Sequence, residues 1–288
     1  MYFCIAGESK TDLDLIADFE TADDLLWHAR ADPERFAGRG RIQVRASGRI
    51  GPLVELVSAH RSDPAAYRSL DIRPALARMV AAALDREEIS GAGVNDRAGV
   101  FPLSRSDPGG VDGVHWDQWM KHVENAAVSA GHARRLMQGL IGAFGELQDN
   151  VHKHSERIET GLAAYGVTAD AFEFVVADSG IGVLASLRQN PEFAHLSDSG
   201  VALRAAASDG ASRLGKTSGH GYGIGQLFRA LAHDAGELRF RSGDWAMTIL
   251  GDRPSLSGQV KLAQKAWLNG LAVTVRCTPS RRSASESG

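Results

Sequence analysis

The chain has 288 residues, enough for one sizeable core and a smaller companion domain, because domains usually hold roughly 100–200 residues. Hydrophobic residues make up 43% and charged residues 23%, which excludes disordered and membrane-spanning compositions, and the net charge of −3 gives no strong attraction to nucleic acid. There is no signal-peptide pattern, and Cys4 and Cys277 form no disulfide or zinc framework. We therefore expect a globular, cytoplasmic protein that does not bind a membrane.

The first part of the chain mixes strand and helix patterns. Short strands are expected at 1–6 and 41–45, and apolar residues recur at helical spacing from 65 to 88. Residues 90–112 are dense in Gly, Pro, Asp and Ser, which is typical of a linker. The sequence therefore predicts an N-terminal domain over 1–112, and its residues indicate no particular chemistry.

The second part has the pattern of an α/β domain. Two helical stretches between 115 and 155 are broken near Gly131, and two β-rich runs at 158–165 and 171–177 predict an antiparallel hairpin. Further helices are expected at 183–189, 198–208 and 222–235, and strands at 237–241, 245–250 and 271–277. We expect residues 113–280 to form a two-layer α/β sandwich, with a mixed, largely antiparallel sheet covered by helices and a frayed tail at 281–288.

The first group of candidate site residues lies on the second predicted helix. Glu146, Asn150 and Lys153 are spaced by four and three residues, which places them on one helical face. They combine a carboxylate that can act as a base, an uncharged amide oxygen that can ligate magnesium, and an ammonium that can contact phosphate. This combination suits a nucleoside triphosphate bound with Mg²⁺.

The second group follows a predicted strand, in the run Asp-Ser-Gly-Ile-Gly that begins at Asp178. A carboxylate at this place can accept a hydrogen bond from the exocyclic amine of adenine, whereas guanine presents a carbonyl at that edge. Gly180 and Gly182 allow the backbone to turn sharply and to approach the base. The pattern therefore favours an adenine nucleotide.

The third group is rich in glycine and opens a predicted helix: Gly219, Gly221, Gly223 and Gly225. Backbone N–H groups and the positive end of the helix dipole bind phosphate at such a place. The polar loop before it carries Arg213 and Lys216, and we expect this loop to act as a lid over the triphosphate.

The three groups resemble the N, G1 and G2 boxes of the GHKL superfamily of ATPases and kinases, which share the Bergerat fold. They follow the same order: ExxxN on a helix, DxGxG after a strand and GxGxG before a later helix. The resemblance covers about residues 116–278, and ELQDNVHKHS is most similar to histidine kinases. It implies that Asn150 ligates magnesium, Lys153 contacts phosphate and Asp178 binds adenine. It also implies that Glu146 is the general base.

The chain departs from this pattern in two ways. Histidine kinases carry a phosphoacceptor His on a long helix, whereas His60 is soon followed by the helix breaker Pro64. Gyrase-like members place a Thr directly after the Gly that opens the last strand, whereas here Gly270 is followed by Leu271, and Thr274 comes later.

Two other readings compete with this one. Residues 210–217 fit the P-loop pattern GxxxxGK[ST], but a P-loop needs a strand before it and a helix after it, and here a helical run precedes it and a glycine-rich run follows. His152 and His154 are two residues apart on a helix, so they point to different sides and cannot share a metal ion.

Two classes of function remain open. In the first, the protein is a magnesium-dependent enzyme that hydrolyses ATP or transfers its γ-phosphoryl group to a protein, and Glu146 favours this class because a pure binder needs no base. In the second, it is a nucleotide-gated interaction module. Both involve ATP and a protein partner, and both are compatible with a homodimer.

Overall fold

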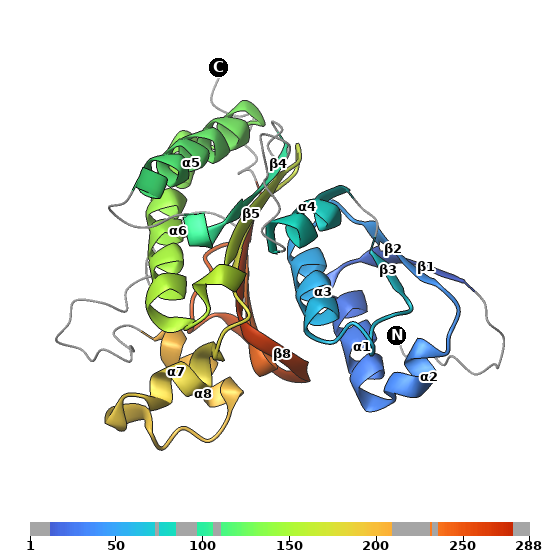
Figure 1. Ribbon diagram of the computed structural model, residues 1–288. Helices are drawn as coiled ribbons and strands as arrows, with labels where there is room; N and C mark the ends of the chain where they lie inside the picture. Colours follow the sequence, from blue (N-terminus) through green and yellow to red (C-terminus); the bar gives the residue numbers. More distant parts are fainter. Residues whose placement is uncertain are drawn as a thin grey trace.

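The computed structural model describes residues 12–72, 75–84, 97–105, 111–208, 231 and 236–278. Figure 1 shows these residues arranged in layers: two long helices, a five-stranded sheet, the helices of the N-terminal part and a three-stranded sheet. The predicted α/β class is confirmed. None of the helices within these ranges has the length and apolarity that a membrane crossing needs.

The five-stranded sheet belongs to the second half of the chain, except for its first strand. Its strands are β4 (Ala98–Pro102), β5 (Leu162–Val167), β6 (Phe172–Ala177), β7 (Gly236–Gly251) and β8 (Gln259–Cys277). They lie in the order β4-β5-β6-β8-β7, and every neighbouring pair is antiparallel. The predicted hairpin is confirmed as β5 and β6, although residues 158–160 form a short 3-10 helix instead of strand.

Helices α5 (Val111–Ser129) and α6 (Arg134–His154) cover one face of this sheet. Alternate strand residues such as Phe172 and Phe174 point towards them, as the two-residue period of a strand requires. Phe144 of α6 stacks on Phe174 with ring centroids 3.5 Å apart. The predicted break between the helices is confirmed at Gly131, whose φ of +100° strongly favours glycine. This packing fixes α6, the helix that carries the first group of candidate site residues.

The N-terminal part is a small unit of parallel strands and helices. Its elements are β1 (Leu13–Ala17), α1 (Phe19–Ala31), α2 (Pro33–Ala37), β2 (Ile42–Ala46), α3 (Gly51–Ser62), β3 (Leu70–Ile72) and α4 (Ala75–Leu84). The strands pair in parallel in the order β1-β2-β3. The predicted strand at 41–45 is confirmed. The predicted helix over 65–88 is wrong over 65–72 and confirmed over 75–84. The rest of it and the strand expected at 1–6 lie outside the described residues.

Residues 98–102 correct the predicted linker at 90–112. They form β4, which pairs with β5 from Ala98 opposite Gly166 to Pro102 opposite Leu162. The Gly and Pro content of this stretch predicts a loop. The side chain of Val100 is instead buried on the face of the sheet that lies away from α5 and α6, in a core shared with α3 and α4. The predicted domain boundary at residue 113 is therefore misplaced, because it assigns β4 to the N-terminal domain although β4 is a strand of the second domain's sheet.

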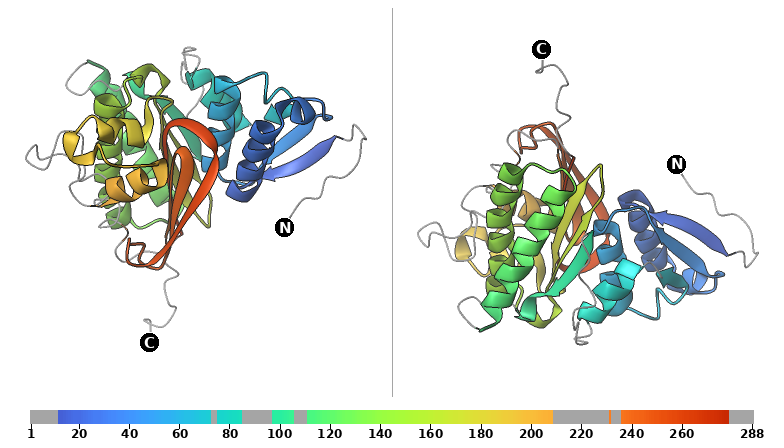
Figure 2. Two further views of the ribbon diagram at one scale, coloured as in Figure 1. Left: turned by 90° about the horizontal axis from the view of Figure 1, so that it is seen from below. Right: turned by 90° about the horizontal axis from the view of Figure 1, so that it is seen from above.

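The second face of the five-stranded sheet is covered by α3 and α4 of the N-terminal part, so the predicted two-layer arrangement has a further layer on that side. Arg239 on β7 is buried there and bonds to both oxygens of Glu55 at 2.9 and 3.0 Å and to Asp23 at 2.6 Å. Glu173 on β6 accepts hydrogen bonds from the backbone of Ile50 and Gly51, at the start of α3. Figure 2 shows from two further sides that the N-terminal part packs against this sheet.

Two short helices follow the hairpin. α7 (Gly182–Arg188) and α8 (Ser199–Ala207) confirm the helices predicted at 183–189 and 198–208. Asp198 caps α8 by accepting a hydrogen bond from the backbone N–H of Val201 at 2.9 Å. The strands predicted at 237–241 and 245–250 are parts of one strand, β7, which continues through a bulge at Gly243.

Candidate nucleotide-binding site

The first three candidate residues lie on the last three turns of α6. The helix is continuous from Arg134 to His154, so the positions of Glu146, Asn150 and Lys153 fall within about 60° of arc. All three are half-buried and lie beside the fully buried stripe that packs on the sheet. The packing of α6 on the sheet thus presents a carboxylate, an amide and an ammonium along one flank of the helix.

Lys153 has a partner that the sequence reading did not single out. Its ammonium bonds to a carboxylate oxygen of Asp149 at 2.9 Å, and both side chains are about one-third exposed. The signal was the spacing of four residues between opposite charges on one helix. An exposed pair of this kind contributes little stability, so Lys153 can exchange this partner for a phosphate at small cost.

Asp178 directly follows strand β6 and is buried. Burial raises the pKa of its carboxyl from 3.8 to about 6, and backbone groups of Gly180 and Leu271 partly oppose that rise. Its Oδ1 accepts a hydrogen bond from the backbone N–H of Gly180 at 2.7 Å. Within the described part of the chain no cationic side chain contributes to the shift. The site therefore holds a desolvated carboxylate that can accept a further donor.

The loop after Asp178 is tied to the end of α6 through Ser155. The backbone N–H of Ile181 donates to the carbonyl oxygen of Ser155 at 3.0 Å. A Cβ on Gly180 would lie 2.0 Å from the same oxygen, so only glycine fits there. Because Ser155 directly follows α6, these contacts bring the helix of Asn150 and Lys153 to the loop of Asp178. The end of α6 is therefore tied to the loop that carries Asp178.

Gly182 also has a role within the protein. Its φ is +75°, and an added Cβ would lie 2.9 Å from Oγ of Ser242. That hydroxyl donates to the carbonyl oxygen of Gly270 at 2.7 Å and accepts from the N–H of Val183 at 3.0 Å. Nothing in the sequence pattern singled out Ser242, because it lies in the bulge of a strand. Packing within the protein therefore already requires glycine at positions 180 and 182. The role of Gly180 and Gly182 in the approach of a base stays a prediction.

Gly270 lies inside β8 rather than opening it, which corrects the expected start of the last strand at 271. Its φ is +74°, and an added Cβ would lie 2.1 Å from the backbone oxygen of Asp178. Thr274 is directed to the other side of the sheet, where its hydroxyl lies close to Gly51 at the start of α3. Thr274 therefore cannot share a water with Asp178. The backbone oxygen of Leu271, which follows Gly270, accepts a hydrogen bond from the N–H of Asp178 at 2.9 Å.

The third candidate group lies outside the described residues, and its role stays a prediction. It comprises Arg213, Lys216, Gly219, Gly221, Gly223 and Gly225, together with the P-loop-like run 210–217 and the helix expected at 222–235. The described residues on either side, Ala207 and Leu231, are both buried in the core that lies under α6.

Within the described ranges there is no group of three or more His, Cys, Asp or Glu side chains that could hold a metal ion. A magnesium ion that enters with a nucleotide does not need such a group, because phosphate oxygens, water and one or two protein oxygens complete its shell. Asn150 offers such an oxygen from a half-buried helical position.

Comparisons of the chain with protein-family models, with curated proteins and with solved structures gave no match.

Proposed function

We propose that this chain binds ATP together with magnesium, between the end of α6 and the loop after β6, and that it hydrolyses ATP or transfers the γ-phosphoryl group to a protein. Asp178 would accept a hydrogen bond from the adenine amine, Asn150 would ligate the magnesium and Lys153 would contact phosphate. Glu146, one turn before Asn150, would take the proton from the attacking water or hydroxyl. Magnesium would supply charge neutralisation for the phosphates.

The observation that carries this proposal is the state of Asp178. Among the described residues Asp178 has no cationic partner, so burial of its carboxylate costs free energy in the folded state, and such groups concentrate at functional sites. Asp178 lies at the end of a strand, next to the helix that carries Asn150. An amine donor from a ligand would offset the cost, and adenine offers one.

The reaction can be tested with γ-labelled ATP and magnesium, by counting free phosphate and protein-bound label separately. Hydrolysis gives free phosphate, and transfer gives labelled protein. Glu146→Gln is expected to abolish either product while ATP still binds, because the amide keeps the shape of the side chain but cannot accept the proton. Unchanged turnover in Glu146→Gln would show that Glu146 is not the general base.

One observation favours the nucleotide-gated module as a second candidate function. Gly270 contacts Asp178, and two residues just before it on β8, Ala266 and Leu268, are buried in the core of the N-terminal part. Nucleotide bound at Asp178 would thus shift the conformational equilibrium of the N-terminal part through β8. Binding of ATP with neither free phosphate nor labelled protein in the experiment above would favour the module.

We expect the protein to prefer ATP over GTP by about tenfold or more, because the guanine carbonyl would leave a buried acceptor unpaired at a cost of about 1–3 kcal/mol. Dissociation constants measured by calorimetry for both nucleotides in the presence of magnesium check this. Equal values would contradict the role given to Asp178, whether or not the protein hydrolyses either nucleotide.

Asp178→Asn is expected to stabilise the nucleotide-free protein at pH 7.5 and to weaken ATP binding. The folded-state pKa of Asp178 is about 6 against an ordinary value of 3.8, so the stability that it contributes is present below pH 3.8 and lost as the pH rises through about 6. The shift corresponds to a cost of up to about 3 kcal/mol at neutral pH, which the amide avoids.

Urea unfolding of both proteins at pH 7.5 and at pH 4 checks this prediction. The gain should be about 1–3 kcal/mol at pH 7.5 and should nearly vanish at pH 4, where the carboxyl is largely protonated in the folded state. The shifted pKa values of other groups, such as Glu173 and His132, cancel in the difference between the two proteins. A loss of stability at pH 7.5 would show that Asp178 is an ordinary structural carboxylate.

A further inference from the structure

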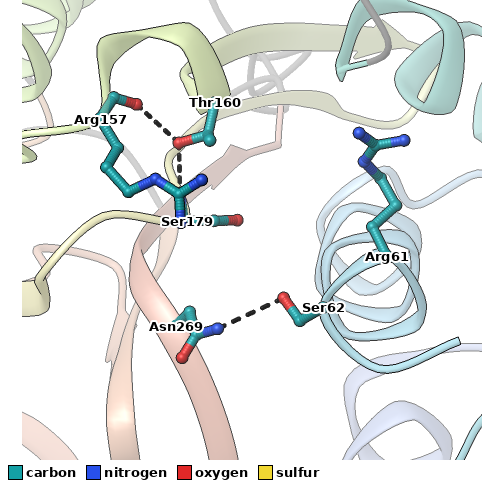
Figure 3. A pocket seen from close by; sticks show the side chains of 6 residues that line it. All are labelled: Arg61, Ser62, Arg157, Thr160, Ser179 and Asn269. Carbon is teal, nitrogen blue, oxygen red and sulfur yellow. Dashed lines mark hydrogen bonds between the residues drawn. The ribbon is translucent and has the colours of Figure 1, made fainter.

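A polar cavity lies where the N-terminal part meets the five-stranded sheet. It has a volume of about 300 Å³ and is lined by Arg61, Ser62, Arg157, Thr160, Ser179 and Asn269. Figure 3 shows these side chains around the cavity; they come from α3, from the segment that follows α6, from the loop after β6 and from β8. Neither Asn150, Lys153 nor Asp178 lines it.

The described lining residues present donors rather than acceptors. Arg61 and Arg157 each carry five N–H groups and a positive charge, and none of the described lining residues is acidic. The indole N–H of Trp267 donates to Oδ1 of Asn269 at 2.8 Å, which fixes the amide so that its NH₂ group faces Ser62 and the cavity. A ligand therefore meets two guanidinium groups and an amide donor.

The acceptors of this cavity are largely used by the protein itself. Oγ1 of Thr160 accepts from the N–H of Ser179 at 2.9 Å and donates to the carbonyl oxygen of Arg157 at 2.7 Å. Oγ of Ser62 lies 3.4 Å from the amide nitrogen of Asn269 and donates to the carbonyl oxygen of Ser58 at 2.9 Å. A cation or a donor-rich ligand thus gains little here, whereas an oxyanion gains several bonds.

Two features oppose an anion at this place, and both are weak. Arg157 contacts the carboxylate of Glu159 at 3.3 Å, but both side chains are substantially exposed, and exposed pairs exchange readily. Ser62 is the last residue of α3, whose negative end disfavours anions, but Arg61 offsets that charge in the same turn. Arg61, Arg157 and Glu159, the charged groups described at the cavity, together carry a net positive charge.

The placement of the donors favours phosphate over carboxylate. Arg61 comes from α3, Arg157 from the segment after α6 and Asn269 from β8, so the donors reach the cavity from different elements. A tetrahedral phosphate has oxygens that can bond in several directions, whereas a carboxylate bonds in one plane. The volume is at the lower end of the range for small-molecule sites.

We propose that this cavity is a binding site for the phosphate group of a small phosphorylated molecule, separate from the site proposed for ATP. Its occupant would bridge the N-terminal part and the sheet, because Arg61 and Ser62 come from α3 while Asn269 comes from β8. Ser179 directly follows Asp178, and Asn269 directly precedes Gly270, which lies close to Asp178, so the ligand would contact the sequence neighbours of both residues.

The test uses inorganic phosphate as the probe and the full chain. Phosphate binding is measured by calorimetry at constant ionic strength, with acetate as a planar comparison anion. Arg61→Gln and Arg157→Gln are each expected to weaken phosphate binding by about tenfold or more, because each removes charged donors. Arg134→Gln is the matched control, since Arg134 is similarly exposed and pairs with Glu124 at 2.8 Å on the far helices.

Asn150→Ala separates this proposal from the proposed function. Phosphate binding that persists in Asn150→Ala and is lost in both arginine variants supports the cavity, even if ATP does not bind at all. Phosphate binding that is lost in Asn150→Ala and kept in Arg61→Gln and Arg157→Gln would overturn it. Loss to the same extent in Arg134→Gln would show general charge attraction and overturn it as well, and equal binding of acetate would overturn the assignment to phosphate.

Discussion

Arg239→Met is expected to lower the free energy of unfolding by about 3 kcal/mol or more, because it leaves two carboxylates buried without their main partner. Burial alone would lower the pKa of Arg239, but Glu55 and Asp23 more than reverse this and raise it, so the arginine stays charged. Arg239 also lies over the ring of Phe19 at 4.3 Å from its centroid. The residue thus joins β7 to both α1 and α3.

Urea unfolding of Arg239→Met checks this expectation, with Arg134→Ala as the control. The pair of Arg134 with Glu124 is also made by one arginine, but it is exposed, so its loss should cost at most about 1 kcal/mol. Lys265 bonds Asp23 at 2.6 Å and would still neutralise that carboxylate in the variant. The expected loss of unfolding free energy therefore lies at the lower end of the range for a broken buried ion pair. Similar losses in the two variants would mean that the buried network contributes no more than a surface pair.

Asn150→Ala is expected to weaken magnesium-dependent ATP binding by about a hundredfold or more, because the variant removes the protein's ligand to the metal and leaves the ion partly unsatisfied. The fold should be unaffected, because Asn150 lies beside the buried stripe of α6 and alanine is a strong helix former. Asn125→Ala, at an exposed position on α5, is the matched control and should bind ATP normally. Normal ATP binding by Asn150→Ala would remove the metal ligand from the proposal.

The elements around Asn150 and Asp178 could be predicted from the sequence because their local patterns agree with their packing. The apolar stripe of α6 located the helix, and the β-rich run at 171–177 located β6, whose residues are all buried. Asp178 stood out because it follows a buried strand and precedes two glycines. The meeting of α6 with this loop through Ser155 could not be predicted, since it depends on a backbone contact.

The N-terminal part was harder to predict for a physical reason. Its three strands are short, and β3 has only three residues, so a strand lay hidden inside an apparent helical pattern around Leu70. The sequence predicts a linker at β4 because its flanks are rich in Gly and Pro, and only its pairing with β5 shows that it belongs to the sheet. The second covered face of the sheet has no local sequence signal, because the ion pairs of Arg239 bring together residues far apart in sequence.

Calorimetric titration of magnesium ATP into the wild-type chain, Asn150→Ala and Lys216→Ala tests the central claim most directly. The account predicts saturable binding by the wild type, loss of binding in Asn150→Ala, and binding in Lys216→Ala that is weakened but still measurable. The P-loop reading makes the opposite prediction, because its lysine is the main phosphate ligand. Normal binding by Asn150→Ala together with abolished binding by Lys216→Ala would contradict the site at α6 and Asp178.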